Sequence, residues 1–135
     1  MSYSIDEIEG IGPVYAEKLQ AVGIKTTEAY LERAKDPKGR KALAEETGID
    51  DKRILKWANM ADLMRISGVG EEYSELLEAA GVDTVKELKH RNAANLHAKM
   101  AEVNEEKKLV RQLPSESAVE KWVAQAKDLP PTMTY

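Results

Sequence analysis

The side chains that could do chemistry in this 135-residue sequence do not form a pattern typical of catalysis. The absence of cysteine excludes a thiolate nucleophile, a disulfide and a thiolate metal site. The sequence has no Gly-x-Ser-x-Gly nucleophile turn and no phosphate loop ending in Gly-Lys-Ser/Thr. His90 and His97 are not spaced with nearby carboxylates as metal ligands would be. We therefore expect no catalytic residues, no metal and no cofactor, and we do not expect an enzyme.

Two glycine pairs, each separated by one apolar residue, occupy equivalent places in an internal repeat. Residues 8–15 return as residues 66–73, and the same offset of 58 relates further identical pairs such as Leu19 and Leu77 or Thr26 and Thr84. The repeat ends correspond at a longer offset of 65, which aligns Trp57 with Trp122. The second copy is therefore about seven residues longer, and we place the extra length between residues 91 and 114.

Caps and helix breakers outline the elements that would position these glycines. Ser4 with Glu7 resembles a capping box, and Thr26 or Thr27 opens another helix that runs to about residue 33. Further helices are predicted over residues 41–47, near 96–108 with Asn92 or Asn95 as the cap, and from Ser115 or Ser117 to the two prolines at 130–131. An apolar stripe at helical spacing predicts one long helix over residues 51–67, which would form the first arm of the second repeat.

The pattern around each glycine pair resembles the helix-hairpin-helix motif. Its first copy uses Ile8, Gly10, Ile11, Gly12 and Ala16, and its second uses Ile66, Gly68, Val69, Gly70 and Ser74. The resemblance implies an all-α, SAM-like fold of two tandem helix-hairpin-helix units, each extended by additional helices. We expect the first unit at residues 1–60, closed by the Trp57 helix. The second unit is expected at residues 61–129, closed by the Trp122 helix, and residues 130–135 are expected to form a flexible tail.

The resemblance also implies sequence-independent DNA binding, in which backbone N–H groups of the turn and the next helix hold a phosphate. In the first copy the implied contacts are Gly10, Ile11, Gly12, Val14, Tyr15 and Lys18. A basic cluster further along could assist, and it comprises Arg33, Lys35, Lys38, Arg40 and Lys41. In the second copy Glu71 and Glu72 open the helix and would repel a phosphate.

Two functions of different classes follow from these observations. The first is weak nucleic-acid binding through the first hairpin, with DNA as the partner. The second is a protein-interaction or scaffold module that keeps the hairpins as structure, with an unidentified protein as the partner. The net charge of −4 counts against a general nucleic-acid binder. The two tryptophans are expected in the core rather than as stacking platforms for bases.

Most of the chain also resembles an uncharacterised bacterial family of domains of unknown function that contains this hairpin. The segments 96–100 and 104–108, the Leu-Pro-Ser sequence at 113–115 and the Lys-Trp pair at 121–122 carry this resemblance. It implies the architecture and no activity.

The overall composition favours helices built on aliphatic side chains. Hydrophobic residues make up 42% of the sequence and charged residues 33%, and there is no phenylalanine. The N-terminal segment is acidic and lacks an apolar signal region, and no apolar run approaches the roughly 20 residues that cross a bilayer. We expect a cytoplasmic protein that makes no contact with a membrane, and the sequence leaves its oligomeric state open.

Overall fold

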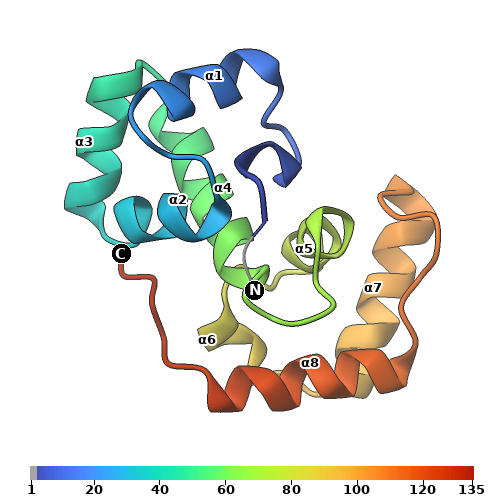
Figure 1. Cartoon of the computed structure of the whole chain (residues 1–135). Helices are drawn as coiled ribbons and strands as arrows, with labels where there is room; N and C mark the ends of the chain where they lie inside the picture. Colours follow the sequence, from blue (N-terminus) through green and yellow to red (C-terminus); the bar gives the residue numbers. More distant parts are fainter. Residues whose placement is uncertain (1–2) are drawn as a thin grey trace.

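The computed structural model describes residues 3–135, and over that range it is helical without a strand (Figure 1). A short 3-10 turn, η1 (Ile5–Glu7), precedes eight α-helices. These are α1 (Pro13–Ala21), α2 (Thr27–Ala34), α3 (Pro37–Thr47), α4 (Asp51–Leu63), α5 (Glu71–Ala79), α6 (Val85–Leu88), α7 (Ala93–Lys107) and α8 (Glu116–Asp128).

The helix boundaries reproduce both offsets of the sequence repeat. Helices α1 and α5 have the same length and start 58 residues apart, and α4 and α8 have the same length and start 65 residues apart. Between them α6 has 4 residues where α2 has 8, whereas α7 has 15 where α3 has 11. These two differences cancel, so the seven additional residues lie in the connections: two between α6 and α7 and five in the loop before α8. Most of the additional length therefore falls within the predicted segment.

Side-chain caps begin most of the helices at the predicted residues. Thr26, Asn92 and Ser115 each accept a hydrogen bond from the backbone N–H three residues later. The predicted cap at Ser4 is wrong, because its side chain makes no capping bond. The backbone carbonyl of Ser4, and not its side chain, accepts the hydrogen bond from the N–H of Glu7 in the 3-10 turn.

Buried side chains form two clusters, one in each half of the chain. The first gathers the apolar residues of η1 and α1–α4 around Trp57, and the second gathers those of α5–α8 around Trp122. Both tryptophans are buried, with 2% and 4% of their surface exposed, as expected of core residues. The clusters meet at Leu63 and Met64, near the predicted boundary at residues 60–61. The division into a unit at residues 1–60 and a unit at residues 61–129 stays a prediction.

The linker between the halves is not one long helix. Helix α4 ends at Leu63, and the N–H groups of Arg65 and Ile66 donate to Asp62 and Leu63 in tight turns. The predicted helix over residues 51–67 is therefore wrong in its last turn. The carboxylate of Asp62, in the last turn of α4, accepts the N–H of Val85 at the start of α6 at 2.8 Å and so joins this end of α4 to the second half.

Residues 130–135 return from α8 to the junction of α2 and α3 (Figure 1). Met133 is buried in the first core cluster, and the N–H of Thr134 donates to the carbonyl of Lys35 at 2.8 Å. This arrangement differs from the flexible tail that the prolines suggest, because an apolar side chain and a backbone donor both find partners in the first half. The mobility of the segment stays a prediction.

Within residues 3–135 no helix has the length and hydropathy needed to cross a membrane.

Candidate functional site

The first glycine turn, residues 8–12, is shaped by Gly10 and closed over Trp57. Gly10 has φ +94°, and a Cβ built on it would lie 3.3 Å from Nε1 of Trp57. Ile11 is buried beneath the turn, and its N–H donates to the carbonyl of Ile8. Tyr15 packs its ring edge-on against Trp57 at 5.2 Å between centroids. The turn therefore packs directly on the aromatic pair of Tyr15 and Trp57.

Gly12 presents the opposite situation on the outer side of the same turn. Its φ of −84° suits any residue, and a Cβ built on it would meet nothing within 4 Å. The packing of the chain therefore gives no reason for glycine at this position. The missing side chain leaves an unobstructed approach to the first turn of α1.

The backbone donors at the start of α1 are open. Within residues 3–135 the N–H groups of Gly12, Val14 and Tyr15 donate to no acceptor, and Pro13 has no N–H. No side chain caps this helix end, and its first turn carries no acidic residue. These donors and the positive end of the helix dipole point to the same place. The arrangement can accept an oxyanion.

Two cations lie close to this helix end, and one of them was not found from the sequence. Lys18 is exposed on α1 and forms no ion pair in the described part of the chain. The guanidinium of Arg53, on α4, lies 5.6 Å from the centroid of the Tyr15 ring. Arg53 also approaches Asp50 at 3.7 Å. Nothing in the sequence links Arg53 to Tyr15, since the contact depends on how α4 packs against α1.

The second glycine turn, residues 66–70, has the same backbone and a different charge. Gly68 also has φ +94° and lies against Nε1 of Trp122, and a Cβ on Gly70 would again meet nothing within 4 Å. Here Glu71 and Glu72 occupy the first turn of α5. An open cavity of about 320 Å³ faces this end, lined by Tyr3, Glu7, Gly68, Gly70, Glu71, Glu72 and Tyr73.

Acidic side chains from both halves meet near this cavity. Partial burial, followed by the charges of Glu9, Glu7, Glu72 and Asp6, raises the pKa of the Glu71 carboxyl above its usual value. The first of these charges is that of Glu9, in the first glycine turn, so a carboxylate of the first half acts on the second turn. This potential disfavours an anion at the second turn.

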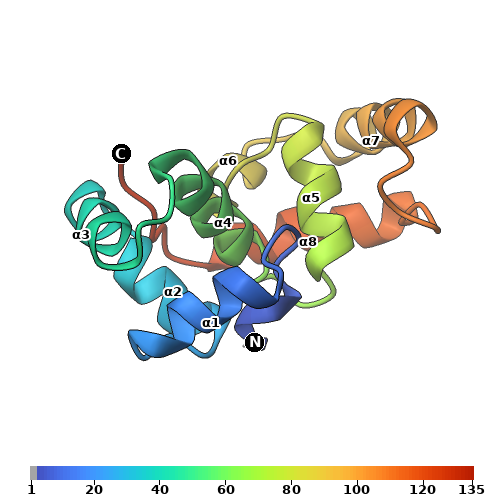
Figure 2. The same ribbon diagram turned by 90° about the horizontal axis from the view of Figure 1, so that it is seen from above.

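The predicted basic cluster lies apart from the first glycine turn. The α2–α3 junction is next to the C-terminus, whereas α1 begins near η1, at the opposite side of the first half (Figures 1 and 2). Arg33 pairs with Glu46, and Lys35 pairs with Glu32 at 2.9 Å. Within the described residues Lys38 and Lys41 form no ion pair.

Arg40, the remaining member of that cluster, holds the C-terminal segment. Its guanidinium donates to the carbonyls of Ala34 at 2.9 Å and Thr134 at 2.7 Å, and it lies 5.5 Å from the centroid of the Tyr135 ring. The structure thus brings together the six predicted contacts of the first turn and α1. It places the five basic residues of α2 and α3 at a second location.

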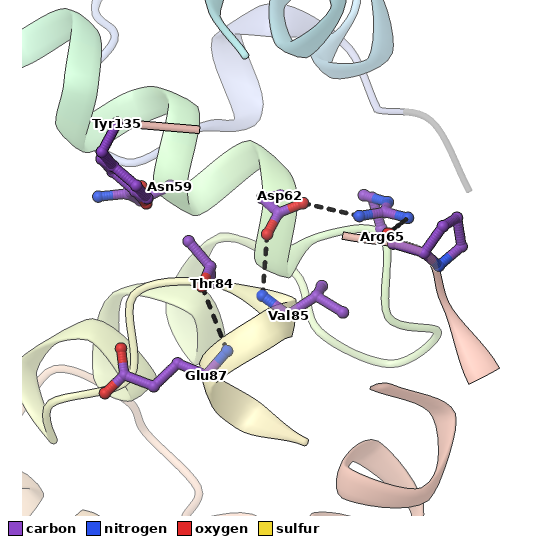
Figure 3. A network of polar contacts seen from close by, with 8 residues as sticks. Asn59, Asp62, Arg65, Thr84, Val85, Glu87 and Tyr135 are labelled. Atoms are coloured by element: carbon purple, nitrogen blue, oxygen red, sulfur yellow. Dashed lines mark hydrogen bonds and ion pairs between the residues drawn. The ribbon is translucent and has the colours of Figure 1, made fainter. Parts of the chain in front are cut away.

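A buried polar network ties the two halves together (Figure 3). Asp62, with 1% of its surface exposed, accepts from Val85 N–H and from Arg65 Nη1, both at 2.8 Å. Arg65 also donates to the carbonyl of Pro130, and Thr84 caps α6 by accepting from Glu87 N–H. Every carboxylate oxygen of Asp62 is engaged by the chain itself, so the network is structural.

No group of three or more histidine, aspartate or glutamate side chains within residues 3–135 is arranged to hold a metal ion. Nε2 of His97 lies 2.9 Å from the carbonyl of Pro114, where it helps to fasten the loop before α8.

The fold and the two turns define an all-helical protein with an internal structural repeat. The family model described as a domain of unknown function (DUF4332) matches residues 9–129. The chain belongs to that family, which agrees with the resemblance seen in the sequence. No solved structure matches the chain.

Proposed function

We propose that the protein is a non-enzymatic binding module of two tandem helix-hairpin-helix units, whose first hairpin binds a phosphate of nucleic acid without sequence preference. The observation that carries the proposal is the set of open N–H donors on Gly12, Val14 and Tyr15 at the start of α1. A phosphate accepts several such donors at once and is favoured by the helix dipole. The bases take no part in these contacts, which makes the binding independent of sequence.

The choice of residues around the donors supports the same reading. Gly12 has no role in packing, and its lack of a side chain lets a phosphate approach the backbone. Lys18 and Arg53 supply positive charge on the side of α1 and α4. The second hairpin has the same backbone conformation, but Glu71 and Glu72 place negative charge at the start of its helix. We propose the phosphate site for the first hairpin alone.

A protein-interaction module is the second candidate, and the exposure of Val14 favours it. Val14 has 65% of its surface exposed at the very start of α1, where a lysine or arginine would serve a phosphate better. An exposed apolar side chain beside a rigid turn is suited to contact with a protein. The acidic surface of the second hairpin would then select a basic partner.

Fluorescence anisotropy of labelled single- and double-stranded DNA, at about 50 and 200 mM salt, separates the two candidates. The decisive variant is Gly12→Ala, and its matched control is Gly70→Ala, because both methyl groups enter open space. A methyl at Gly12 displaces a phosphate from one or more charge-assisted hydrogen bonds, so we expect about a tenfold loss of affinity. Gly70→Ala should leave affinity unchanged.

Charge variants provide an independent reading of the same site. Arg53→Gln and Lys18→Glu should weaken DNA binding and reduce its salt dependence, while Lys52→Gln, next to Arg53 in sequence, serves as the control. Equal effects of Gly12→Ala and Gly70→Ala would contradict a phosphate site at the first hairpin. Absence of DNA binding at low salt, together with self-association that survives high salt, would favour the protein-interaction module.

A further inference from the structure

Tyr135 is an exposed aromatic ring held in a fixed position. The residue has 69% of its surface exposed, yet its hydroxyl donates to Oδ1 of Asn59 at 2.7 Å. The Arg40 guanidinium lies 5.5 Å from the ring centroid. Arg40 is itself anchored to two backbone carbonyls, so both the ring and its cation are positioned in advance. An exposed tyrosine is ordinarily free to rotate, whereas this one is held by its hydroxyl and contacted by Arg40 on the ring.

The ring borders an open cavity with an apolar wall. This Tyr135 cavity has a volume of about 440 Å³ and lies between α3, α4 and the C-terminal segment. It is lined by Pro37, Arg40, Lys41, Asp51, Leu55 and Tyr135. The volume falls within the range of small-ligand sites, about 300–1,000 Å³, and accommodates a nucleotide.

Charge is distributed unevenly around the cavity. Lys41 lines it without an ion pair, and Lys38 stands one turn away on the same helix, also unpaired within the described residues. The hydroxyl end of Tyr135 is different. The pKa of the Tyr135 hydroxyl is raised to about 12, first by burial and then by the charges of Asp83 and Asp62. Glu87 has a smaller effect in the same direction, and the charge of Arg40 opposes the shift. Asp51 adds a carboxylate to the lining on the α4 side. An anionic group of a ligand therefore fits on the α3 side, next to Lys41, and an uncharged planar group fits over the ring.

We propose that the Tyr135 cavity binds single-stranded nucleic acid, with one base stacked on Tyr135 and the adjacent phosphate held by Lys41. The inference rests on the proposed function in so far as nucleic acid is the partner, and it concerns a separate site. A base in a duplex is stacked on both faces and cannot reach the ring, so the site selects single strands. Arg40 lies over one face of the ring, so the base stacks on the other face, with Leu55 and Pro37 at the edge of the base.

Tyr135→Leu is the variant that tests stacking. Base–aromatic stacking contributes about 1–3 kcal/mol per base, so we expect at least a fivefold loss of affinity for a labelled oligothymidine of about 15 nucleotides. Affinity for a duplex of the same length should be unchanged. Tyr135→Phe keeps the ring and should retain most of the affinity. Equal losses in the Leu and Phe variants would overturn the stacking contact.

Lys41→Gln tests the phosphate contact without touching the core or the tail. We expect weaker oligothymidine binding and a shallower salt dependence, by about 0.7 in the slope for one contact. Lys121→Gln, an exposed lysine on α8, removes the same charge elsewhere and should have no effect. Unchanged binding in Lys41→Gln, or an equal loss in Lys121→Gln, would overturn the phosphate contact.

Gly12→Ala, measured in parallel, keeps this proposal separate from that of the first hairpin. If Gly12→Ala weakens duplex binding while Tyr135→Leu and Lys41→Gln change nothing, the Tyr135 site is refuted and the hairpin stands. If the reverse holds, the hairpin is refuted and the Tyr135 site stands. Failure of the unaltered protein to bind either DNA at about 50 mM salt refutes both.

Discussion

Gly10 and Gly12 lie two residues apart in one turn, and alanine should have opposite effects on stability at the two positions. At Gly10 a side chain must adopt φ +94° and displace Trp57, which lies 3.3 Å from the position of the new Cβ. Positive φ at an ordinary residue costs about 1–3 kcal/mol, and the shift of a buried indole adds to it. We expect Gly10→Ala to lower the free energy of unfolding by about 2–3 kcal/mol.

At Gly12 the sign reverses. The backbone there suits alanine, and the methyl group meets no atom within 4 Å. Alanine restricts the unfolded chain more than the folded one, which stabilises a protein by about 0.4–1 kcal/mol. The two variants should therefore differ by about 3 kcal/mol. At a typical urea dependence of about 1.5 kcal/mol per M, their unfolding midpoints differ by about 2 M.

Urea titration followed by tryptophan fluorescence measures this difference, because Trp57 lies directly under the turn. The second turn offers a replicate, since Gly68 and Gly70 have the same relation to Trp122. A loss of stability in Gly12→Ala as large as that in Gly10→Ala would refute the reasoning. A more stable Gly12→Ala variant that binds DNA less tightly would indicate that glycine serves a ligand at this position.

Three further predictions concern the contacts between the halves and the acidic surface. Asp62→Ala leaves Arg65 and the Val85 N–H without their buried acceptor, so urea unfolding should show a loss of about 3 kcal/mol in the free energy of unfolding. The control Asp83→Ala, at an exposed position, should change that free energy by no more than about 0.5 kcal/mol. Met133→Ala should cost about 2 kcal/mol although it lies in the terminal segment, because its side chain is part of the first core; equality with Thr132→Ala in thermal unfolding would contradict this. Burial and neighbouring carboxylates raise the pKa of Glu71, so the folded state binds the proton of this carboxyl more tightly than the unfolded state does. The contribution of Glu71 to the free energy of unfolding therefore falls as the pH rises above the ordinary pKa of a glutamate. Glu71→Gln should accordingly raise the urea midpoint at pH 7, with a gain that shrinks towards pH 4, and the exposed Glu120→Gln on α8 should show no such trend.

Much of the helical outline is predictable because it depends on neighbours in sequence. Thr26, Asn92 and Ser115 cap helices through atoms three residues away, and Gly48 ends α3 with φ +72°. The internal repeat presents the same signals twice, so each helix predicted in one copy supports the equivalent helix in the other. Local rules do not reveal long-range contacts, such as the bond from the Val85 N–H to the Asp62 carboxylate 23 positions away, and they place the end of α4 about one turn too late.

The candidate sites divide in the same way. The glycine turn and the donors of α1 are contiguous in sequence, so residues 10–18 could be identified from the pattern alone. Arg53 comes to Tyr15 through helix packing, and Tyr135 comes to Arg40 and Asn59 across 76 residues or more. No periodicity or composition encodes such contacts. The five basic residues of α2 and α3 lie far from the turn for the same reason.

The position of Met133 in the first core has a consequence for how the chain is made. A ribosome completes residues 5–64 long before it reaches residue 133, so the first half leaves the exit tunnel with a vacancy among its buried side chains. Until residue 134 is added, Lys35 and Arg40 also lack their hydrogen-bond partner Thr134. The first half therefore reaches its final packing only after the second has been synthesised, and nascent chains stalled before residue 133 should be more sensitive to protease in the first half than released protein.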